Sequence, residues 1–523
     1  MSGAGQAANA GAAMNQPAKK PNIVVIWGDD IGLWNLSAYN RGAMGYRTPN
    51  IDRIANEGAL FSDHYGQPSC TAGRAAFITG QLPIRSGMTT VAQVGGRLGL
   101  QHQTATLAEV LKTQGYMCGQ FGKNHLGDRN EFLPTVHGFD EFFGNLYHLN
   151  TEEEPEDCDY PQDPAFRQRH GPRGVLRSWA TAEEQPHEDP RFGKWGRQRI
   201  EDTGPLTRQR MERIDEEFID ASFDFMERAV AADKPFFAWI ATTRMHVFTH
   251  VPSEYKDRAR HHTSGDDLHC AGMLQHDENV GSVLDRLDAL GIADNTIVIY
   301  STDNGPETDT WPHGATSPYR SMKMTTWEGA MRVPMMVRWP GRIAPRTELN
   351  GIQSHEDVFT TLASAAGLPD IRERLARGDA LGTGVVKKNH VDGVDNLDYW
   401  TGKTDRSARD HILYYAESRL QAVRWKQWKM HFYTRDGYYG HTQKLEIPLL
   451  FNIRQDPFEY FDGAPGPRAT VLQSKAHVFH AAGEIVAAHL RTFQQFPPVQ
   501  KGTSLSFAEA LEAAQTQHKE KLA

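Results

Sequence analysis

Short apolar runs rich in β-branched and aromatic residues recur along the chain, with amphipathic segments between them. The runs cover residues 22–27 (NIVVIW), 117–121, 236–241 (FFAWIA), 296–301 (TIVIYS) and 333–339. A continuous apolar run of this length predicts a strand that is buried on both faces, as strands of parallel sheets are.

The segments between these runs carry helix signals. Thr48-Pro49 opens a helical pattern that stops at Gly58, and Thr106 and Glu109 match a capping box. Residues 277–290 place their apolar side chains on one helical face. Strands that alternate with helices predict an α/β fold, a large, mostly parallel sheet flanked by helices.

Two zones lack this periodicity. Residues 151–210 are rich in Pro, Glu, Asp and Arg and predict a loop-like insertion, whose acidic run 152–157 we expect to be a solvated loop. Residues 369–396 form a second loop-like zone.

The C-terminal part has another pattern. Residues 422–433 alternate large and polar residues like an antiparallel strand, residues 450–453 resemble another strand, and residues 506–522 have a helical pattern. We therefore expect a disordered tail over 1–20, an α/β catalytic domain over 21–408, and a smaller C-terminal α+β domain with an antiparallel sheet over 409–523.

Composition narrows the class of protein. The chain has 523 residues, 39% of them hydrophobic, and 56 Lys and Arg against 65 Asp and Glu give a net charge of −9. These values exclude a disordered, collagenous or coiled-coil chain, and they provide no overall attraction to nucleic acid or anionic membranes. An anionic substrate would therefore need a local basic pocket.

The N-terminal 20 residues lack the apolar core of a signal peptide, and no apolar run is long enough to span a membrane, so a cytoplasmic location is predicted. The four cysteines, with no C-x-x-C pair, make no disulfide framework, so one of them could be chemical rather than structural.

Acidic residues follow two of the predicted strands. Asp29 and Asp30 come after the first strand, and Asp303 and Asn304 come after residues 296–301. Ligands of open α/β sheets bind beyond the carboxyl ends of the strands, and a cluster of carboxylate and amide oxygens there selects Ca²⁺ or Mg²⁺. The alternative is that these are turn or capping residues, and Asn304-Gly305 is a good hairpin turn.

Basic residues follow or adjoin the other strands. Lys123 and His125 come after residues 117–121, His246 comes after residues 236–241, and Lys323 precedes residues 333–339. Lys and His beside a cation form an anion pocket with acid–base capacity, as hydrolysis of a sulfate or phosphate ester requires. The alternative for each is a solvated or hydrogen-bonded surface group, the class to which we assign His250, His261 and His262.

Cys70 stands at a predicted helix start, where backbone N–H groups favour an anion and lower the pKa of a thiol. Arg74 is four residues further and shares its helical face. The alternative is a small buried thiol with a surface arginine.

With these residues in place, the chain resembles a type I, formylglycine-dependent sulfatase of the arylsulfatase kind, in the alkaline phosphatase superfamily. Residues 70–74 (CTAGR) match the family signature C-x-[P/A]-x-R. The resemblance covers most of residues 21–460 and includes Asp29-Asp30, 48–52 (TPNID), 122–127 (GKNHLG), His246, 302–305 (TDNG) and 323–334. Departures from the pattern are Ala72 for the commoner Pro, Asn124 for an aromatic residue, and Ala330 for a second Gly.

The resemblance implies hydrolysis of sulfate monoesters of the aryl sulfate type. A separate maturation enzyme would oxidise Cys70 to Cα-formylglycine, whose hydrate attacks sulfur and forms a covalent sulfated intermediate. Four residues would bind Ca²⁺: Asp29, Asp30, Asp303 and Asn304. The remaining roles implied are orientation of the hydrate by Arg74 and Lys123, sulfate contacts from Lys123 and Lys323, protonation of the leaving oxygen by His246, and proton removal by His125.

Three alternatives remain open. A phosphonate monoesterase or phosphodiesterase of the same superfamily shares the nucleophile and the metal. A di-zinc phosphatase would want a His where Asn304 stands. A non-catalytic binding protein could retain the fold. The sequence also allows an oligomer.

Overall fold

A computed structural model of the chain describes residues 19–91, 94–263, 267–309, 314–463, 465–502 and 504–505. Nearly all of the predicted tail 1–20 and the helical pattern of residues 506–522 lie outside the described residues. Within the described part, no helix is both long and apolar enough to cross a membrane.

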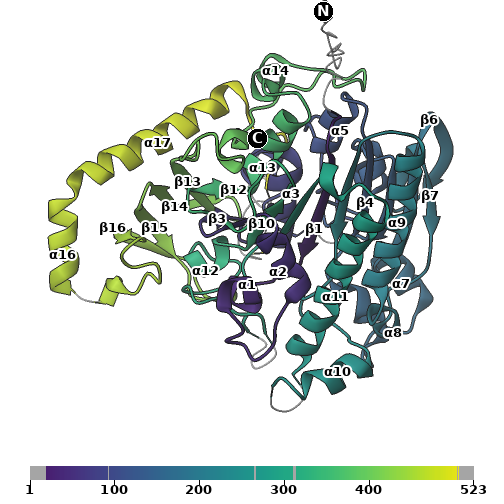
Figure 1. Ribbon diagram of the computed structural model, residues 1–523, viewed down its shortest axis with the longest axis horizontal. Helices are drawn as coiled ribbons and strands as arrows, with labels where there is room; N and C mark the ends of the chain where they lie inside the picture. Colours follow the sequence, from purple (N-terminus) through teal and green to yellow (C-terminus); the bar gives the residue numbers. More distant parts are fainter. Residues whose placement is uncertain are drawn as a thin grey trace, which may run out of the picture.

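A ten-stranded mixed sheet forms the centre of the molecule (Figure 1). Neighbouring strands pair in parallel from β9 through β1, β8 and β4 to β5, and among the described strands of this sheet β6 and β10 run opposite to the others. The prediction of a large, mostly parallel sheet is confirmed. In spatial order the strands are β11 (Thr347–Leu349), β2 (Ala59–Phe61), β10 (Met335–Arg338), β9 (Thr296–Thr302), β1 (Asn22–Gly28), β8 (Phe236–Ala241), β4 (Met117–Gly122), β5 (Glu141–Asn145), β6 (Val175–Asp189) and β7 (Gly193–Asp202).

Strand β1 shows why the central strands read as continuous apolar runs. Its alternate residues Ile23, Val25 and Trp27 belong to one core, which also contains residues of α3, α5 and α13. Val24 and Ile26 belong to a second core with residues of α2, α9 and α11. Because side chains alternate between the faces of a strand, both faces of β1 are buried under helices.

The longer helices that cover the two faces are α2 (Pro49–Asn56), α3 (Cys70–Thr79), α5 (Leu107–Lys112), α9 (Ile214–Ala231), α11 (Leu268–Ala289) and α13 (His355–Ala365). The predicted capping box is present, because Thr106 accepts a hydrogen bond from the backbone of Glu109. Shorter helices are α1 (Ser37–Asn40), α4 (Pro83–Ser86), α6 (Leu149–Glu153), α7 (Pro164–His170), α8 (Arg208–Met211), α10 (Ser253–Ala259), α12 (Glu328–Met331), α14 (Ile371–Arg377) and α15 (Leu397–Trp400).

The structure corrects several local predictions. Strand β10, in the run 333–339, pairs antiparallel with both of its neighbours, although its buried apolar run suggested a parallel strand. An antiparallel strand with helices on both faces has the same apolar pattern, so the pattern does not give direction. In the second zone expected to be loop-like, residues 371–377 form α14.

Residues 151–210 are more ordered than a loop. They contain the antiparallel hairpin of β6 and β7, which extends the main sheet beyond β5 (Figure 1). The acidic run is not fully solvated, because Glu152 and Glu153 are buried and Glu153 pairs with His250 and Arg208. A two-stranded ribbon of mostly exposed residues needs no apolar alternation, so its sequence resembles a loop.

The C-terminal part forms a separate four-stranded antiparallel sheet, in the order β13 (His411–Ala416), β14 (Arg419–Trp425), β15 (Trp428–Thr434) and β16 (Gln443–Asn452). Residues 422–433, predicted as one strand, are parts of β14 and β15 joined by a tight turn. Helix α17 (Ala476–Gln495), which follows α16 (Pro465–Ser474), packs on this sheet through Val478 and Ala482.

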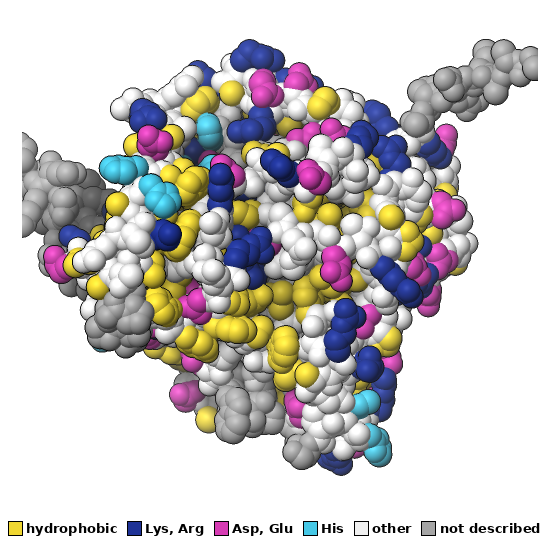
Figure 2. Space-filling view, turned by 60° about the vertical axis from the view of Figure 1, so that its left-hand side comes forward, with side chains coloured by type: hydrophobic (Ala, Val, Ile, Leu, Met, Phe, Trp, Pro, Cys, Tyr) yellow, Lys and Arg dark blue, Asp and Glu magenta, His cyan; other side chains and the backbone are white. Residues whose placement is uncertain are grey.

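Apolar side chains of this C-terminal core reach the surface. Trp428, Phe432 and Phe479 pack against the core and are only partly buried. Figure 2 shows hydrophobic side chains across the middle of this side of the molecule, with charged side chains around them. A final two-stranded sheet of β3 (His64–Tyr65) and β12 (Gln353–Ser354) lies where the chain approaches Cys70.

Candidate active site

The ends of β1 and β9 bring the two predicted acidic pairs together. The strands are neighbours in register, with Gly28 opposite Thr302, so the residues that follow them meet. The amide of Asn304 donates to Asp30 Oδ1 at 2.6 Å, and the backbone N–H of Asp30 donates to Asp303 Oδ1 at 3.3 Å. Asp30 has a φ of 58°, a left-handed conformation that is uncommon for a non-glycine residue.

Cys70 is the first residue of α3, as predicted, and is buried. Its Sγ lies 3.6 Å from Asp29 Oδ1 and 3.9 Å from Asp30 Oδ1. The helix approaches the end of β9 very closely, because a Cβ on Gly73 would lie 2.0 Å from the carbonyl oxygen of Asp303. The glycine of the CTAGR segment therefore permits the packing that places Cys70 beside the acidic cluster.

Arg74 and Lys123 lie on the inner side of this cluster. The Arg74 guanidinium is fully buried, with Nη2 3.2 Å from Asp29 Oδ2 and 2.9 Å from Asp303 Oδ2. Its Nη1 donates to the carbonyl oxygen of Lys123 at 2.7 Å, and the Lys123 ammonium pairs with Asp29. Arg74 is therefore buried, which excludes the alternative of a small buried thiol with a surface arginine.

Lys323 and His246 complete the site from other loops. Lys323 Nζ lies 2.7 Å from Asp30 Oδ2 and also pairs with Glu307, which the sequence reasoning did not identify. His246 Nε2 lies 3.8 Å from Asp30 Oδ2, and its Nδ1 donates to the carbonyl oxygen of Val247 at 2.9 Å.

His125 reaches the site in a left-handed conformation, with a φ of 57°. Its carbonyl oxygen accepts a hydrogen bond from Thr71 at 3.1 Å. His148, absent from the prediction, lies between two predicted residues: its ring stacks on His246 at 5.5 Å and meets His125 edge-on at 5.4 Å. His148 follows the end of β5, so the strand-end rule could have indicated it.

The pKa values follow from burial and from the neighbouring charges. Burial, then Lys123, lowers the pKa of His125 well below its usual value, and burial, then Lys323, does the same for His246. Burial opposes the charge on Lys323, but Asp30, Cys70 and Glu307 raise its pKa well above the usual value. Burial opposes the charge on Lys123 too, but Asp29 and Cys70 raise its pKa. Both imidazoles are therefore neutral and both lysines charged near pH 7.

The expectation of a lowered thiol pKa at Cys70 was wrong. Burial, and after it the charge of Asp29, raises the pKa of the Cys70 thiol well above its usual value. The helix N-terminus is outweighed because the thiol lies in a low-dielectric site beside carboxylates. Cys70 is a protonated thiol here, not a thiolate nucleophile.

The donor set fits a hard divalent cation. Asn304 Oδ1 is buried with no hydrogen-bond partner among the described residues, and the amide nitrogen of the same side chain donates to the Asp30 carboxylate. Ligand atoms of Asp29, Asp30, Cys70 and His246 lie within 4.8 Å of one another. Asp303 lies outside that group; its Oδ2 accepts from Arg74 and its Oδ1 from two backbone N–H groups. Oxygen ligands of this kind suit Ca²⁺ or Mg²⁺.

His250, which we assigned to the hydrogen-bonded surface groups, pairs with Glu153 at 2.6 Å. Asn124, the departure from the family pattern between Lys123 and His125, is buried, and its Oδ1 accepts from Gln120 at 3.1 Å. All four cysteines are free, as the sequence predicted.

Comparison with known proteins agrees with this arrangement. The sulfatase family profile matches residues 21–368, and that of the C-terminal region of aryl-sulfatase matches residues 407–518. The chain is 32% identical to N-acetylgalactosamine-6-sulfatase of Canis lupus familiaris, over 84% of this chain and 81% of that protein. It is 31% identical to human arylsulfatase A, over 87% of this chain and 86% of that protein.

A similar solved structure is that of PsFucS1 sulfatase from Pseudoalteromonas sp., with a TM-score of 0.77 and 26% identity over 92% of both chains. The chain belongs to the sulfatase family. It is a sulfuric ester hydrolase.

Proposed function

We propose that this sulfatase cleaves sulfate monoesters of the aryl sulfate type through a Cα-formylglycine made from Cys70, with Ca²⁺ held by Asp29, Asp30, Asp303 and Asn304. The observation that carries the proposal is the position of Cys70. It stands at the start of α3 with its Sγ 3.6 Å from Asp29, beside the buried Arg74 and Lys123.

The cation would supply charge neutralisation for a sulfate oxygen and orientation of the nucleophile. Asn304 Oδ1, which has no partner among the described residues, and the carboxylates of Asp29 and Asp30 are the groups most available to hold it. The Asp303 carboxylate would bind it while also accepting from Arg74 and from backbone N–H groups. Mg²⁺ is the alternative ion, because the donors are the same.

Lys123 and Lys323 would bind the sulfate group. Both ammonium groups are buried and paired with carboxylates of the cluster, so they are already oriented when the ester arrives. Fixed charges in a water-excluded site stabilise developing negative charge more strongly than the same charges do in water.

His246 would protonate the leaving oxygen, and His125 would accept a proton at the end of the cycle. Lys323 and Lys123 contribute to the low pKa of His246. A bound sulfate monoester offsets those positive charges, so its arrival raises the pKa of His246 toward the range that a general acid needs.

The experiment that tests the proposal combines mass spectrometry with kinetics. After native expression with a formylglycine-generating maturation enzyme, the peptide containing Cys70 is expected to carry formylglycine, and the protein is expected to release sulfate from 4-nitrophenyl sulfate. An unmodified thiol in a fully active protein would contradict the formylglycine step. An unmodified thiol without turnover would instead support a binding protein.

A phosphonate monoester or phosphodiester hydrolase is the second candidate, because these esters carry one negative charge, as sulfate monoesters do, and Lys123 and Lys323 would serve either anion. Turnover of an aryl sulfate and of an aryl phosphonate monoester by the same preparation decides between them, and a preference for the phosphonate overturns the sulfatase assignment. The substrate panel includes a sulfated N-acetylgalactosamine, because one relative is named for that sugar. A cytoplasmic location remains our proposal, which cell fractionation tests.

A further inference from the structure

The first turn of α3, which carries Cys70, lacks a side-chain cap. Ser69 is the N-cap of α3, but its side chain makes no capping hydrogen bond, and among the described residues its buried Oγ has no hydrogen-bond partner. The backbone N–H of Gln67 reaches the carbonyl oxygen of Asp303 only at 3.4 Å. An N-cap hydrogen bond normally fixes the first turn of a helix, and the nucleophile stands in that turn.

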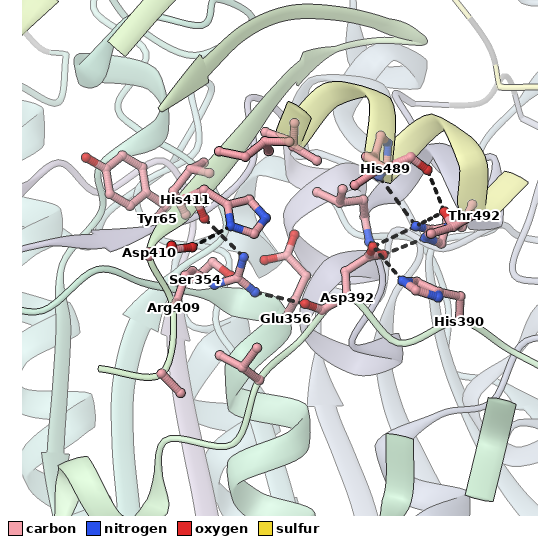
Figure 3. A pocket seen from close by; sticks show the side chains of 18 of the residues that line it. Tyr65, Ser354, Glu356, His390, Asp392, Arg409, Asp410, His411, His489 and Thr492 are labelled. Atoms are coloured by element: carbon pink, nitrogen blue, oxygen red, sulfur yellow. Dashed lines mark hydrogen bonds and ion pairs between the residues drawn. The ribbon is translucent and has the colours of Figure 1, made fainter. Parts of the chain in front are cut away.

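A cavity lies behind this segment. It has a volume of about 310 Å³ and is lined by residues around Gln67, at the start of α13, and from β13 and α17 (Figure 3). On this side the segment lacks the close packing that otherwise immobilises a buried chain. Backbone hydrogen bonds from Gly66 to Met331 at 2.8 Å and from Met324 to Pro68 at 2.6 Å hold the segment, and a side-chain contact on the cavity side adds to them.

Glu356, the second residue of α13, supplies this contact. Its Oε1 accepts a hydrogen bond from Gln67 Nε2 at 2.6 Å. This bond is as short as the one that the backbone N–H of Met324 donates to the carbonyl oxygen of Pro68. Both side chains are almost fully buried. Figure 3 shows the Glu356 carboxyl group pointing into the cavity, between His411 and Asp392.

We propose that Glu356 is a positioning residue for the reaction: through its hydrogen bond to Gln67 it fixes the segment 66–69 and thereby the first turn of α3, which carries Cys70. Neither side chain touches the reacting atoms. The inference rests on the proposed function, because it concerns the placement of the residue formed from Cys70. A small displacement of a nucleophile costs rate without weakening the contacts that bind the substrate.

The test uses variants that keep volume but differ in hydrogen bonding. Gln67→Met and Glu356→Met remove the bond, whereas Glu356→Gln retains an oxygen that accepts from Gln67. Arg372→Ala, which changes another residue of the cavity wall, is the matched control. For each variant we measure kcat and KM on 4-nitrophenyl sulfate, the formylglycine fraction at position 70, and the thermal midpoint.

We expect both Met variants to lower kcat by roughly 10- to 100-fold with KM within about twofold of the wild type. Glu356→Gln and Arg372→Ala are expected to keep most of kcat. The double Met variant is expected to be no slower than the slower single variant, because both remove the same bond.

Three results would overturn the inference: an unchanged kcat in Gln67→Met, a loss in Glu356→Gln as large as that in Glu356→Met, or a loss explained by a lower formylglycine fraction. If Glu356→Met does not fold, Gln67→Met and Glu356→Gln decide alone. A wild-type protein without sulfatase turnover would instead refute the proposed function.

Discussion

Two clusters of buried charges in this protein are built differently. The first joins the C-terminal sheet to the rest of the protein: both carboxylate oxygens of Asp63 accept hydrogen bonds from Arg424, at 2.6 and 2.8 Å, and Arg332 and Arg454 also pair with Asp63. The second is the active site, where Asn304 Oδ1 and His125 Nδ1 are buried and have no hydrogen-bond partner in the described part of the chain.

The two acids at the centres of these clusters respond in opposite ways. Burial would raise the pKa of Asp63, but Arg332 and Arg424 hold it below its usual value. Burial raises the pKa of Asp30 despite the nearby Lys323. The Asp63 carboxylate, which is paired through both oxygens, stabilises the contact between the C-terminal sheet and the rest of the protein. The active-site cluster, in which Asn304 Oδ1 has no partner among the described residues, is suited to take a cation and an anion.

The strongest test of this contrast is Cys70→Ala. We expect turnover to fall by at least about 10³-fold, because the nucleophile is lost, while the free energy of unfolding changes by less than about 2 kcal/mol. Aryl sulfate kinetics and urea unfolding measure the two effects. Cys118→Ala, which changes a buried thiol under α5, is the control and is expected to retain activity. Full activity in Cys70→Ala would refute the mechanism.

A change in the Asp63 cluster is expected to have the opposite effect, a large loss of stability. Arg424→Met leaves Asp63 with a buried, partly unpaired charge, so the free energy of unfolding is expected to fall by about 3–5 kcal/mol. The control is Arg454→Met, because the Arg454 side chain is 45% exposed yet pairs with the same carboxylate. Its expected loss is below about 1 kcal/mol. If urea unfolding shows equal losses of unfolding free energy for the two variants, burial does not make the Arg424–Asp63 pair stronger than the Arg454–Asp63 pair.

Removal of the metal tests whether the active-site acids need a cation. Chelation is expected to abolish turnover and to lower the thermal midpoint, and added Ca²⁺ is expected to restore both. A cation at a hundred times its Kd stabilises the folded protein by about 2.7 kcal/mol. Asn304→Ala is expected to raise the Ca²⁺ concentration needed for restoration. A thermal midpoint that changes with neither the chelator nor added Ca²⁺ would contradict the assigned site.

Glu356 is a buried acid outside both clusters, and replacing it is expected to change stability less than Arg424→Met does. Burial, only partly offset by Arg409, raises its pKa to about 7 from the usual 4.5. The folded state therefore holds a proton that the unfolded state releases, so the wild type loses stability as pH rises from about 4.5 to about 7. Glu356→Gln lacks this penalty and is expected to gain up to about 2–3 kcal/mol at about pH 8, but nothing below about pH 4.5. Urea unfolding at both pH values measures the difference, and an equal gain at both would contradict it.

Much of the site could be predicted because strand ends converge. Asp29 and Asp303 are 274 residues apart in the chain, and the parallel pairing of β1 with β9 places them together. The strand-end residues were therefore predictable from the sequence alone. Gln67 and Glu356 were not, because neither follows a strand of the main sheet and their contact depends on how α13 packs against α3.

The sequence by itself determined the kind of fold and the residue types of the site. Apolar runs indicate which segments are buried, and the carboxylates, lysines and histidines indicate which chemistry the site can perform. Only the tertiary structure decided the direction of β10, the hairpin within residues 151–210, and the ionisation of Cys70, His125 and His246. Strand direction depends on which neighbour supplies the hydrogen bonds. Ionisation depends on burial and on charges from distant parts of the chain, which no local pattern records.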